Sequence, residues 1–106
     1  MYNILVCDDD KEIVDAIDIY LAKEGYNVIK AYDGLTALKL MKENDIKLII
    51  IDIMMPGIDG LRATLKIRES SGVPIIILSA KSEDSDKIIG LDVGADDYIT
   101  KPFNPL

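Results

Sequence analysis

Short apolar runs that alternate with helix-like segments are the feature that most constrains the fold of this chain. Residues 48–51 and 75–78 are runs of β-branched and leucine side chains, and residues 4–7 form another apolar run. Between them, apolar residues recur at helical spacing. Because strands that alternate with helices along a chain form parallel sheets, the sequence predicts an α/β fold built from βα units.

Five strands and four helices are expected. Residues 27–32 alternate polar and apolar side chains, which is typical of an edge strand, whereas the run at 48–51 is typical of a central strand. We therefore predict a doubly wound, five-stranded parallel sheet with strand order 2-1-3-4-5. The expected strands are residues 4–7, 27–32, 48–53, 73–78 and 97–100. The first expected helix lies between Asp10 and Gly25, and the second follows a turn at Asp33 and Gly34. After a loop at 54–60, the third and fourth helices are expected over 61–68 and 82–93.

The last residues predict a helix that the printed sequence does not contain. Asn104 and Pro105 are typical of a helix start, yet the sequence stops at Leu106. We expect residues 1–106 to be one domain that is truncated before or within its last helix. Right-handed crossovers would place the first and last helices on one face of the sheet and the other three on the opposite face. One face would then be only half covered, which favours contact with a partner.

Composition excludes several classes of function. A chain of 106 residues with 49% hydrophobic residues forms a single globular domain rather than a disordered segment. Its net charge of −7 would repel a phosphate backbone, so we expect no direct binding to nucleic acid. There is no His for acid–base catalysis or zinc binding, and Cys7 is expected to be a buried core residue. The apolar runs are too short to cross a bilayer, so we expect a cytoplasmic protein.

Polar residues follow the predicted strands at the same end. Asp8 and Asp9 follow the first strand, Asp52 follows the run at 48–51, and Ser79 and Lys101 follow the last two strands. Because open α/β sheets place their sites at the carboxyl ends of the strands, these side chains should share one crevice. Three carboxylates suit a hard cation such as Mg²⁺. Without the cation, two carboxylates about 5 Å apart repel by roughly 3 kcal/mol at an effective dielectric of about 20.

This set of residue types indicates phosphoryl chemistry. An ionised Asp52 can act as a nucleophile on phosphorus and form an aspartyl phosphate. Mg²⁺ and Lys101 would offset charge on the phosphoryl oxygens, and the Ser79 hydroxyl would donate to another of them. The ordinary alternative is that Asp8 and Asp9 only cap a helix and that Lys101 is a solvated surface charge. The coincidence of several strand ends favours the shared site.

Four segments of the sequence resemble bacterial response-regulator receiver domains. They read VCDDD, LIIIDIMMPGIDG, PIIILSAKS and GADDYITKPF, in the order and at the spacing of that family, and the similarity runs over residues 4–106. The branch that it resembles is the winged-helix, OmpR/PhoB type, and within it the regulators of vancomycin resistance. The resemblance implies a flavodoxin-like, CheY-like fold and a phosphorylation-dependent switch that controls an output, such as transcription through a DNA-binding domain absent here.

The resemblance also assigns roles to the residues of the crevice. It implies that Asp52 accepts the phosphoryl group from a sensor histidine kinase. Asp8 and Asp9 would hold Mg²⁺ together with Asp52, with Asp9 the more direct ligand and the backbone carbonyl of Met54 as a further one. Ser79 and Lys101 would contact the phosphoryl group.

Further positions are implied by the same resemblance. Tyr98 would be the aromatic residue that turns inward on activation, although a strand aromatic that covers the sheet is an equally ordinary reading. The bond between Lys101 and Pro102 would be cis. The face formed by the helix at 82–93 and the strand at 97–100 would serve a homodimer, against the simpler reading of a solvated charged surface. The residues on that face are Lys87, Asp92, Asp96 and Asp97.

Three alternatives remain open on the sequence. A haloacid-dehalogenase-type phosphatase also uses a strand-end Asp and Mg²⁺, but its second Asp is replaced here by Met54, so we expect no turnover on external substrates. A flavodoxin-like cofactor carrier needs a phosphate-binding loop after the first strand, where this chain has Asp8, Asp9 and Asp10. A degenerate receiver that acts only as a binding module is disfavoured because every phosphorylation position is filled.

Overall fold

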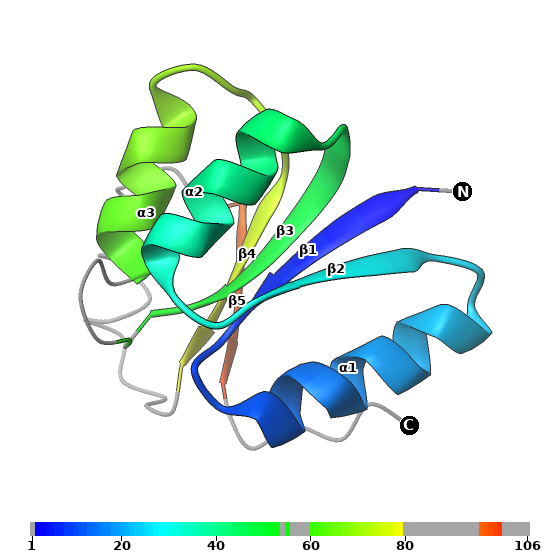
Figure 1. The fold of residues 1–106 in the computed structure, drawn as a ribbon. Coiled ribbons are helices and arrows are strands. Elements are labelled where there is room, and N and C mark those ends of the chain that lie inside the picture. Colours follow the sequence, from blue (N-terminus) through cyan, green and yellow to red (C-terminus); the bar gives the residue numbers. More distant parts are fainter. Residues whose placement is uncertain (1, 54, 56–59, 80–95, 101–106) are drawn as a thin grey trace.

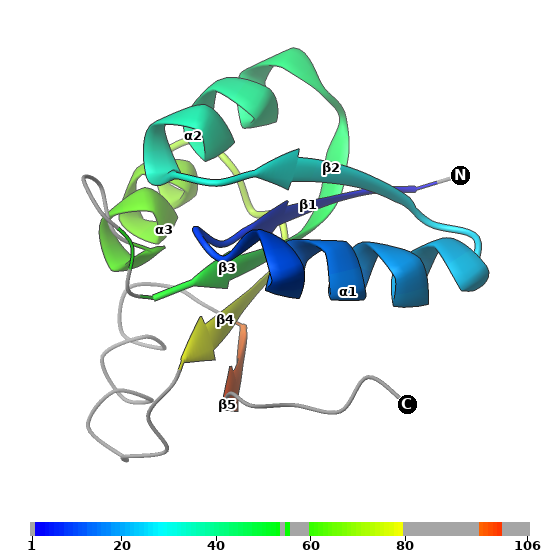
Figure 2. The same cartoon turned by 60° about the horizontal axis from the view of Figure 1, so that its bottom comes forward.

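A five-stranded parallel sheet forms the centre of the computed structural model, which describes residues 2–53, 55, 60–79 and 96–100. The strand order is β2-β1-β3-β4-β5, and every neighbouring pair is parallel. Helix α1 covers one face of the sheet, and α2 and α3 cover the other (Figure 1, Figure 2). The predicted doubly wound fold and strand order are confirmed. The helices expected over 82–93 and at the end of the chain lie outside the described residues.

The strands differ in how deeply they are buried. They span Asn3–Cys7 (β1), Asn27–Ala31 (β2), Ile46–Asp52 (β3), Ile75–Ser79 (β4) and Asp97–Thr100 (β5). In β1 the last four residues are buried, as expected for a strand with a neighbour on each side and helices on both faces. In β2 only Ala31 is buried, which agrees with its edge position.

Local hydrogen bonds fix where the helices begin and end. Helix α1 spans Lys11–Lys23, α2 spans Gly34–Glu43 and α3 spans Gly60–Arg68. The Asp10 carboxylate caps α1, and the Asp33 carboxylate caps α2 by accepting from the N–H of Thr36 at 2.7 Å. At the end of α1, Gly25 has a φ of 89°. The N–H of Gly25 donates to the carbonyl of Ala22, and the N–H of Tyr26 donates to the carbonyl of Leu21. These two bonds form a Schellman motif.

Each face of the sheet has its own hydrophobic core because alternate strand side chains point to opposite faces. From β1, Leu5 packs with the helices α2 and α3, whereas Ile4 and Val6 pack with α1. Full burial of one such aliphatic side chain contributes about 1.5–3 kcal/mol. No helix in the described ranges has the length and apolar character needed to cross a membrane.

The structure corrects several predicted boundaries. Strand β3 begins at Ile46 and not at residue 48 as predicted. The exposed Lys47 interrupts the apolar pattern, which hid the buried Ile46 from the sequence analysis. Strand β4 begins at Ile75, because Pro74 has no N–H for the ladder. Asp33, predicted as turn chemistry only, is a helix cap. Gly60, predicted as the end of a loop, is the first residue of α3.

Candidate functional site

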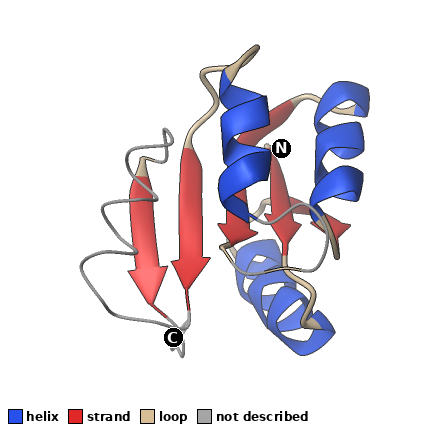
Figure 3. Ribbon diagram, turned by 90° about the vertical axis from the view of Figure 1, so that its left-hand side faces the viewer, coloured by secondary structure: helices blue, strands red, loops and turns tan. Residues whose placement is uncertain are grey.

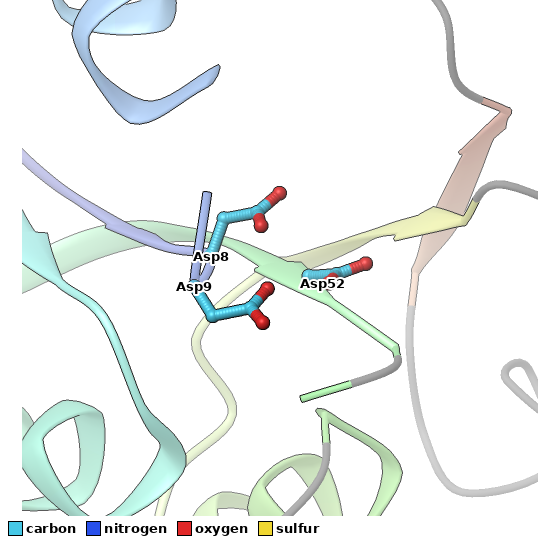
Figure 4. Close-up of side chains that lie close together, drawn as sticks. All are labelled: Asp8, Asp9 and Asp52. Atoms are coloured by element: carbon cyan, nitrogen blue, oxygen red, sulfur yellow. The ribbon is translucent and has the colours of Figure 1, made fainter. Parts of the chain in front are cut away.

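Three carboxylates converge at the carboxyl edge of the sheet. Asp8 and Asp9 follow β1, Asp52 ends β3, and their carboxyl groups point to the same side of the edge (Figure 4). Each residue contributes one carboxylate oxygen to a group of atoms that all lie within 4.8 Å of one another. Asp8 is 0% and Asp52 4% exposed, whereas Asp9 is exposed. Two of the three acids are therefore held by the core, and the third faces solvent.

The register of the strands explains this convergence. All strands point in the same direction, so their carboxyl ends meet at one edge (Figure 3). Cys7 of β1 pairs with Ile51 of β3, so the residues that follow them, Asp8 and Asp52, lie side by side at this edge. Asp52 in turn pairs with Leu78 of β4. Residues 44 positions apart in the sequence, 8 and 52, thus become neighbours through strand pairing alone.

Hydrogen bonds hold the chain that leaves β1. The N–H of Asp8 donates to the carbonyl of Ala31 in β2 at 3.1 Å, and an Asp8 carboxylate oxygen accepts the N–H of Asp10 at 3.0 Å. The Asp10 carboxylate accepts the N–H of Glu12 at 3.0 Å and caps α1. Capping is therefore performed by Asp10, so the alternative that Asp8 and Asp9 serve only as helix caps does not hold.

The acids give the crevice a negative potential. Beneath them, the Cys7 thiol is buried and lies 3.3 Å from the carbonyl oxygen of Asp33 and 3.5 Å from the sulfur of Met55. Burial, followed by the charges of Asp33, Asp8, Asp52 and Asp9, raises the pKa of Cys7 from 9.0 to about 12. The thiol is neutral at physiological pH, which confirms its predicted role as a core residue.

The backbone also places other predicted site residues near this edge. Ser79 is the last residue of β4 and pairs with Thr100, the last residue of β5, one position beyond the pairing of Asp52 with Leu78. Tyr98 lies within β5 and pairs with Ile77. Met54, Lys101 and Pro102 lie outside the described residues, so their predicted roles stay predictions.

The predicted dimer face is described only in part. Lys87 and Asp92 lie outside the described residues, and Asp97 is exposed at the start of β5. The Asp96 carboxylate is engaged within the fold, because it accepts the N–H of Ile75 at 2.8 Å and pairs with Arg68 at 2.6 Å.

Sequence reasoning missed two residues that support the fold, Gly60 at this edge of the sheet and Arg68 at the opposite, amino edge. Gly60 packs against the main chain of Asp52, and Arg68 connects α3 to the start of β5. The only available signal for Gly60 was its position eight residues after Asp52, between a breaker-rich loop and a helical pattern. Nothing in the sequence pattern pairs Arg68 with Asp96.

Comparison with known proteins settles the family. Residues 4–106 match the family described as response regulator receiver domain. The chain belongs to that family. This match covers nearly the whole chain and confirms the family predicted from the four motifs. The comparisons give no support to a phosphatase or a cofactor carrier.

Individual relatives agree with this assignment. The regulatory protein VanR of Enterococcus faecium is 50% identical over 104 residues, covering 98% of this chain and 45% of VanR. The chain spans less than half the length of the curated relatives it matches. The predicted resemblance to regulators of vancomycin resistance is thereby confirmed.

Solved structures show the same fold. The receiver domain of Francisella response regulator 1452 aligns with a TM-score of 0.93 at 40% identity, covering 99% of this chain and 88% of that chain. The response regulator TrrA of Thermotoga maritima, solved in complex with Mg²⁺-BeF, aligns with a TM-score of 0.87 at 37% identity, covering 98% of this chain and 90% of that chain.

Proposed function

We propose that this receiver domain is a switch in which Asp52 takes a phosphoryl group from a sensor histidine kinase. The observation that carries the proposal is the convergence of Asp52, Asp8 and Asp9 within 4.8 Å at the end of the central strand. Asp52 is buried at its base and ends β3, so its carboxylate is held at a fixed place on the edge of the sheet. The domain acts as a signalling switch rather than as a metabolic enzyme.

The acidic cluster fits Mg²⁺ by chemistry and by spacing. Its donors are carboxylate oxygens, which are the ligands this hard cation prefers. Oxygens around one Mg²⁺ at about 2.1 Å lie at most about 4.2 Å apart, so a spread of 4.8 Å needs only small side-chain rotations. Asp8, Asp9 and Asp52 would hold the ion, with the carbonyl of Met54 as a further ligand. Bound there, Mg²⁺ offsets negative charge on the phosphoryl oxygens. The complex of TrrA with Mg²⁺-BeF supports this choice of cation.

The reaction needs only a nucleophile and groups that offset charge. One carboxylate oxygen of Asp52 attacks phosphorus and forms a new P–O bond. The bond from phosphorus to the donor nitrogen breaks, and the nitrogen keeps the electron pair. Lys101 and Ser79 contact the other phosphoryl oxygens, and Tyr98 changes position in response. The result is an additional negative charge at the carboxyl edge of the sheet.

The partners follow from the family and from the length of its members. A sensor histidine kinase supplies the phosphoryl group, and the output is control of transcription through a DNA-binding segment. The name of a relative, the transcriptional regulatory protein YvrH of Bacillus subtilis, of which this chain spans 44%, supports that output. The receiver domain itself makes no contact with nucleic acid or membrane. Homodimerisation through the face that contains Lys87, Asp92, Asp96 and Asp97 and a cytoplasmic location remain predictions.

Incubation with acetyl phosphate tests the proposal. In the presence of Mg²⁺, intact-mass spectrometry should show the addition of one phosphoryl group to the wild type. The adduct should be absent from Asp52→Asn, because an amide is not nucleophilic at this position. The adduct should also be lost when a chelator removes Mg²⁺.

The control is Asp45→Asn, which removes an exposed acid outside the cluster. It should be phosphorylated like the wild type. An unchanged mass of the folded wild type, or an adduct that persists in Asp52→Asn, would contradict the proposal.

A further inference from the structure

Gly60 lies against the main chain of Asp52. A Cβ atom added at Gly60 would lie 1.9 Å from the carbonyl oxygen of Asp52, 2.7 Å from its carbonyl carbon and 2.9 Å from Cα of Ile53. The residue is buried, and its φ is not in the left-handed region. The position therefore requires glycine because no side chain fits there, and not because of conformational freedom.

Two backbone hydrogen bonds hold Ile53, the residue after Asp52, from two sides. The N–H of Ile53 donates to the carbonyl of Leu78 in β4 at 2.9 Å, and the carbonyl of Ile53 accepts the N–H of Gly60 at 3.2 Å. Strand β3 ends at Asp52, so these two bonds replace the ladder where it stops. One side of the support is β4, and the other is the first residue of α3.

A buried hydroxyl fixes the supporting turn of α3. Thr64 is 0% exposed, and its Oγ1 donates to the carbonyl of Gly60 at 2.7 Å. This bond adds to the helical ladder and joins Thr64, one turn further along α3, to Gly60, which contacts Asp52. A buried hydroxyl requires a hydrogen-bond partner, and the Gly60 carbonyl supplies it.

We propose that Gly60 is a positioning residue for the phosphoacceptor, because its missing side chain lets α3 support the backbone of Asp52. The inference depends on the proposed function of Asp52. A side chain at position 60 would push the Asp52 carbonyl away by more than 1 Å, since the nearest acceptable contact is about 3 Å. The carboxylate would then leave its place beside Asp8 and Asp9. Misplacement by about 1 Å costs a reaction up to 10²-fold in rate.

Three glycine-to-alanine variants separate positioning from stability. Gly60→Ala should lower the rate constant of phosphorylation by acetyl phosphate at least about tenfold per folded molecule. It should also raise the Mg²⁺ concentration at half-saturation, measured by isothermal titration calorimetry without any phosphodonor. Gly72→Ala is the matched neutral control, because nothing lies within 4 Å of a Cβ there.

Gly25→Ala is the control for stability. Its φ of 89° strains any other residue, so this variant should melt at a lower temperature. At a temperature where circular dichroism shows it folded, its rate constant and Mg²⁺ affinity should equal those of the wild type. A role of Gly60 in stability alone would give the same result for Gly60→Ala, and that result would overturn the inference.

If Gly60→Ala does not fold, the variant Thr64→Val tests whether α3 positions Asp52. It keeps the shape of the side chain and removes the bond to the Gly60 carbonyl, so phosphorylation of the folded variant should slow by about fivefold. An unchanged rate constant in Thr64→Val would overturn the inference. If the wild type itself takes up no phosphoryl group, the proposed function falls, and this inference falls with it.

Discussion

At the scale of single residues, consecutive aspartates after β1 have different surroundings. Asp8 is buried and accepts a backbone N–H, Asp9 is exposed within the acidic cluster, and Asp10 caps α1. The chain turns from strand to helix over these positions, so the carboxylates of Asp8 and Asp9 join the acidic cluster, whereas that of Asp10 turns to the N-terminus of α1. Substitutions at Asp9 and Asp10 should therefore have separate effects.

Asp9→Asn should raise the melting temperature in chelator and abolish stabilisation by Mg²⁺. It removes one of three close negative charges, and a gain of about 1 kcal/mol corresponds to about 4 °C in a domain of this size. The wild type should gain about 2.7 kcal/mol at an Mg²⁺ concentration 100-fold above its dissociation constant, and the variant should gain none. Scanning calorimetry in EDTA and in MgCl₂ measures both effects.

The control for Asp9→Asn is again Asp45→Asn, in which the charge lost is exposed and outside the cluster. This variant should keep the full response to Mg²⁺ and should change the melting temperature in chelator by less than Asp9→Asn does. A lower melting temperature for Asp9→Asn than for the wild type in chelator would refute the argument from repulsion.

Asp10→Ala should show the opposite behaviour. Loss of the cap on α1 should lower the free energy of unfolding by about 1 kcal/mol, while the stabilisation by Mg²⁺ stays the same. Urea unfolding with and without Mg²⁺ measures both quantities. Asp33→Ala, which removes the equivalent cap on α2, is the matched variant and should cost a similar amount. Loss of the Mg²⁺ response in Asp10→Ala would place Asp10 in the metal site instead.

At the scale of elements, Arg68 and Asp96 join α3 to strands β4 and β5 at the amino end of the sheet. Arg68 is the last residue of α3, and its guanidinium donates to the carbonyls of Ser71 and Val73 and to the carboxylate of Asp96. Asp96 also exchanges two hydrogen bonds with the backbone of Ile75, each 2.8 Å long. Asp96 precedes β5, so this cluster holds β5 in its register with β4.

Removal of this cluster should destabilise the fold measurably. Arg68→Gln and Asp96→Ala should each lower the free energy of unfolding by about 1–2 kcal/mol, because charged hydrogen bonds to backbone groups are lost. The double variant should lose less than the sum, with a coupling of about 0.5 kcal/mol or more. Urea unfolding of the four proteins measures this coupling.

The pair Lys47 and Asp45 is the matched control for that experiment. The Nζ of Lys47 and an Oδ of Asp45 lie 3.3 Å apart, and the two side chains are 51% and 79% exposed, respectively. Because exposed ion pairs contribute little, Lys47→Gln should change the free energy of unfolding by less than about 0.5 kcal/mol. Additive effects of Arg68→Gln and Asp96→Ala would show that the two residues act independently.

Element boundaries show what could and could not be predicted from the sequence. The strands were found because β-branched runs such as 48–51, in which Ile49 and Ile51 are buried and Leu48 and Ile50 half-buried, contain no competing signal. The start of α3 was missed because glycine ordinarily breaks helices, and its use here depends on a contact with Asp52 in another element. Local patterns carry no information about such contacts.

At the scale of the whole molecule, the acidic cluster could be predicted from the sequence. Parallel strands align their carboxyl ends, so the polar residues that follow 4–7 and 48–51 had to meet once the strand order was known. The link from Arg68 to Asp96 did not follow, because it joins residues 28 positions apart through side-chain reach and not through strand pairing.

The place of β1 between β2 and β3 has a consequence for synthesis. Strand β1 leaves the ribosome before its two partners, β2 and β3, which end at residues 31 and 52. At about 5–20 residues per second, the interval between residues 7 and 52 lasts roughly 2–9 s. During that time the hydrophobic side chains of β1 lack one of their neighbours. The apolar segment that leads to the acidic cluster is thus incompletely covered in the nascent chain until β3 has been synthesised.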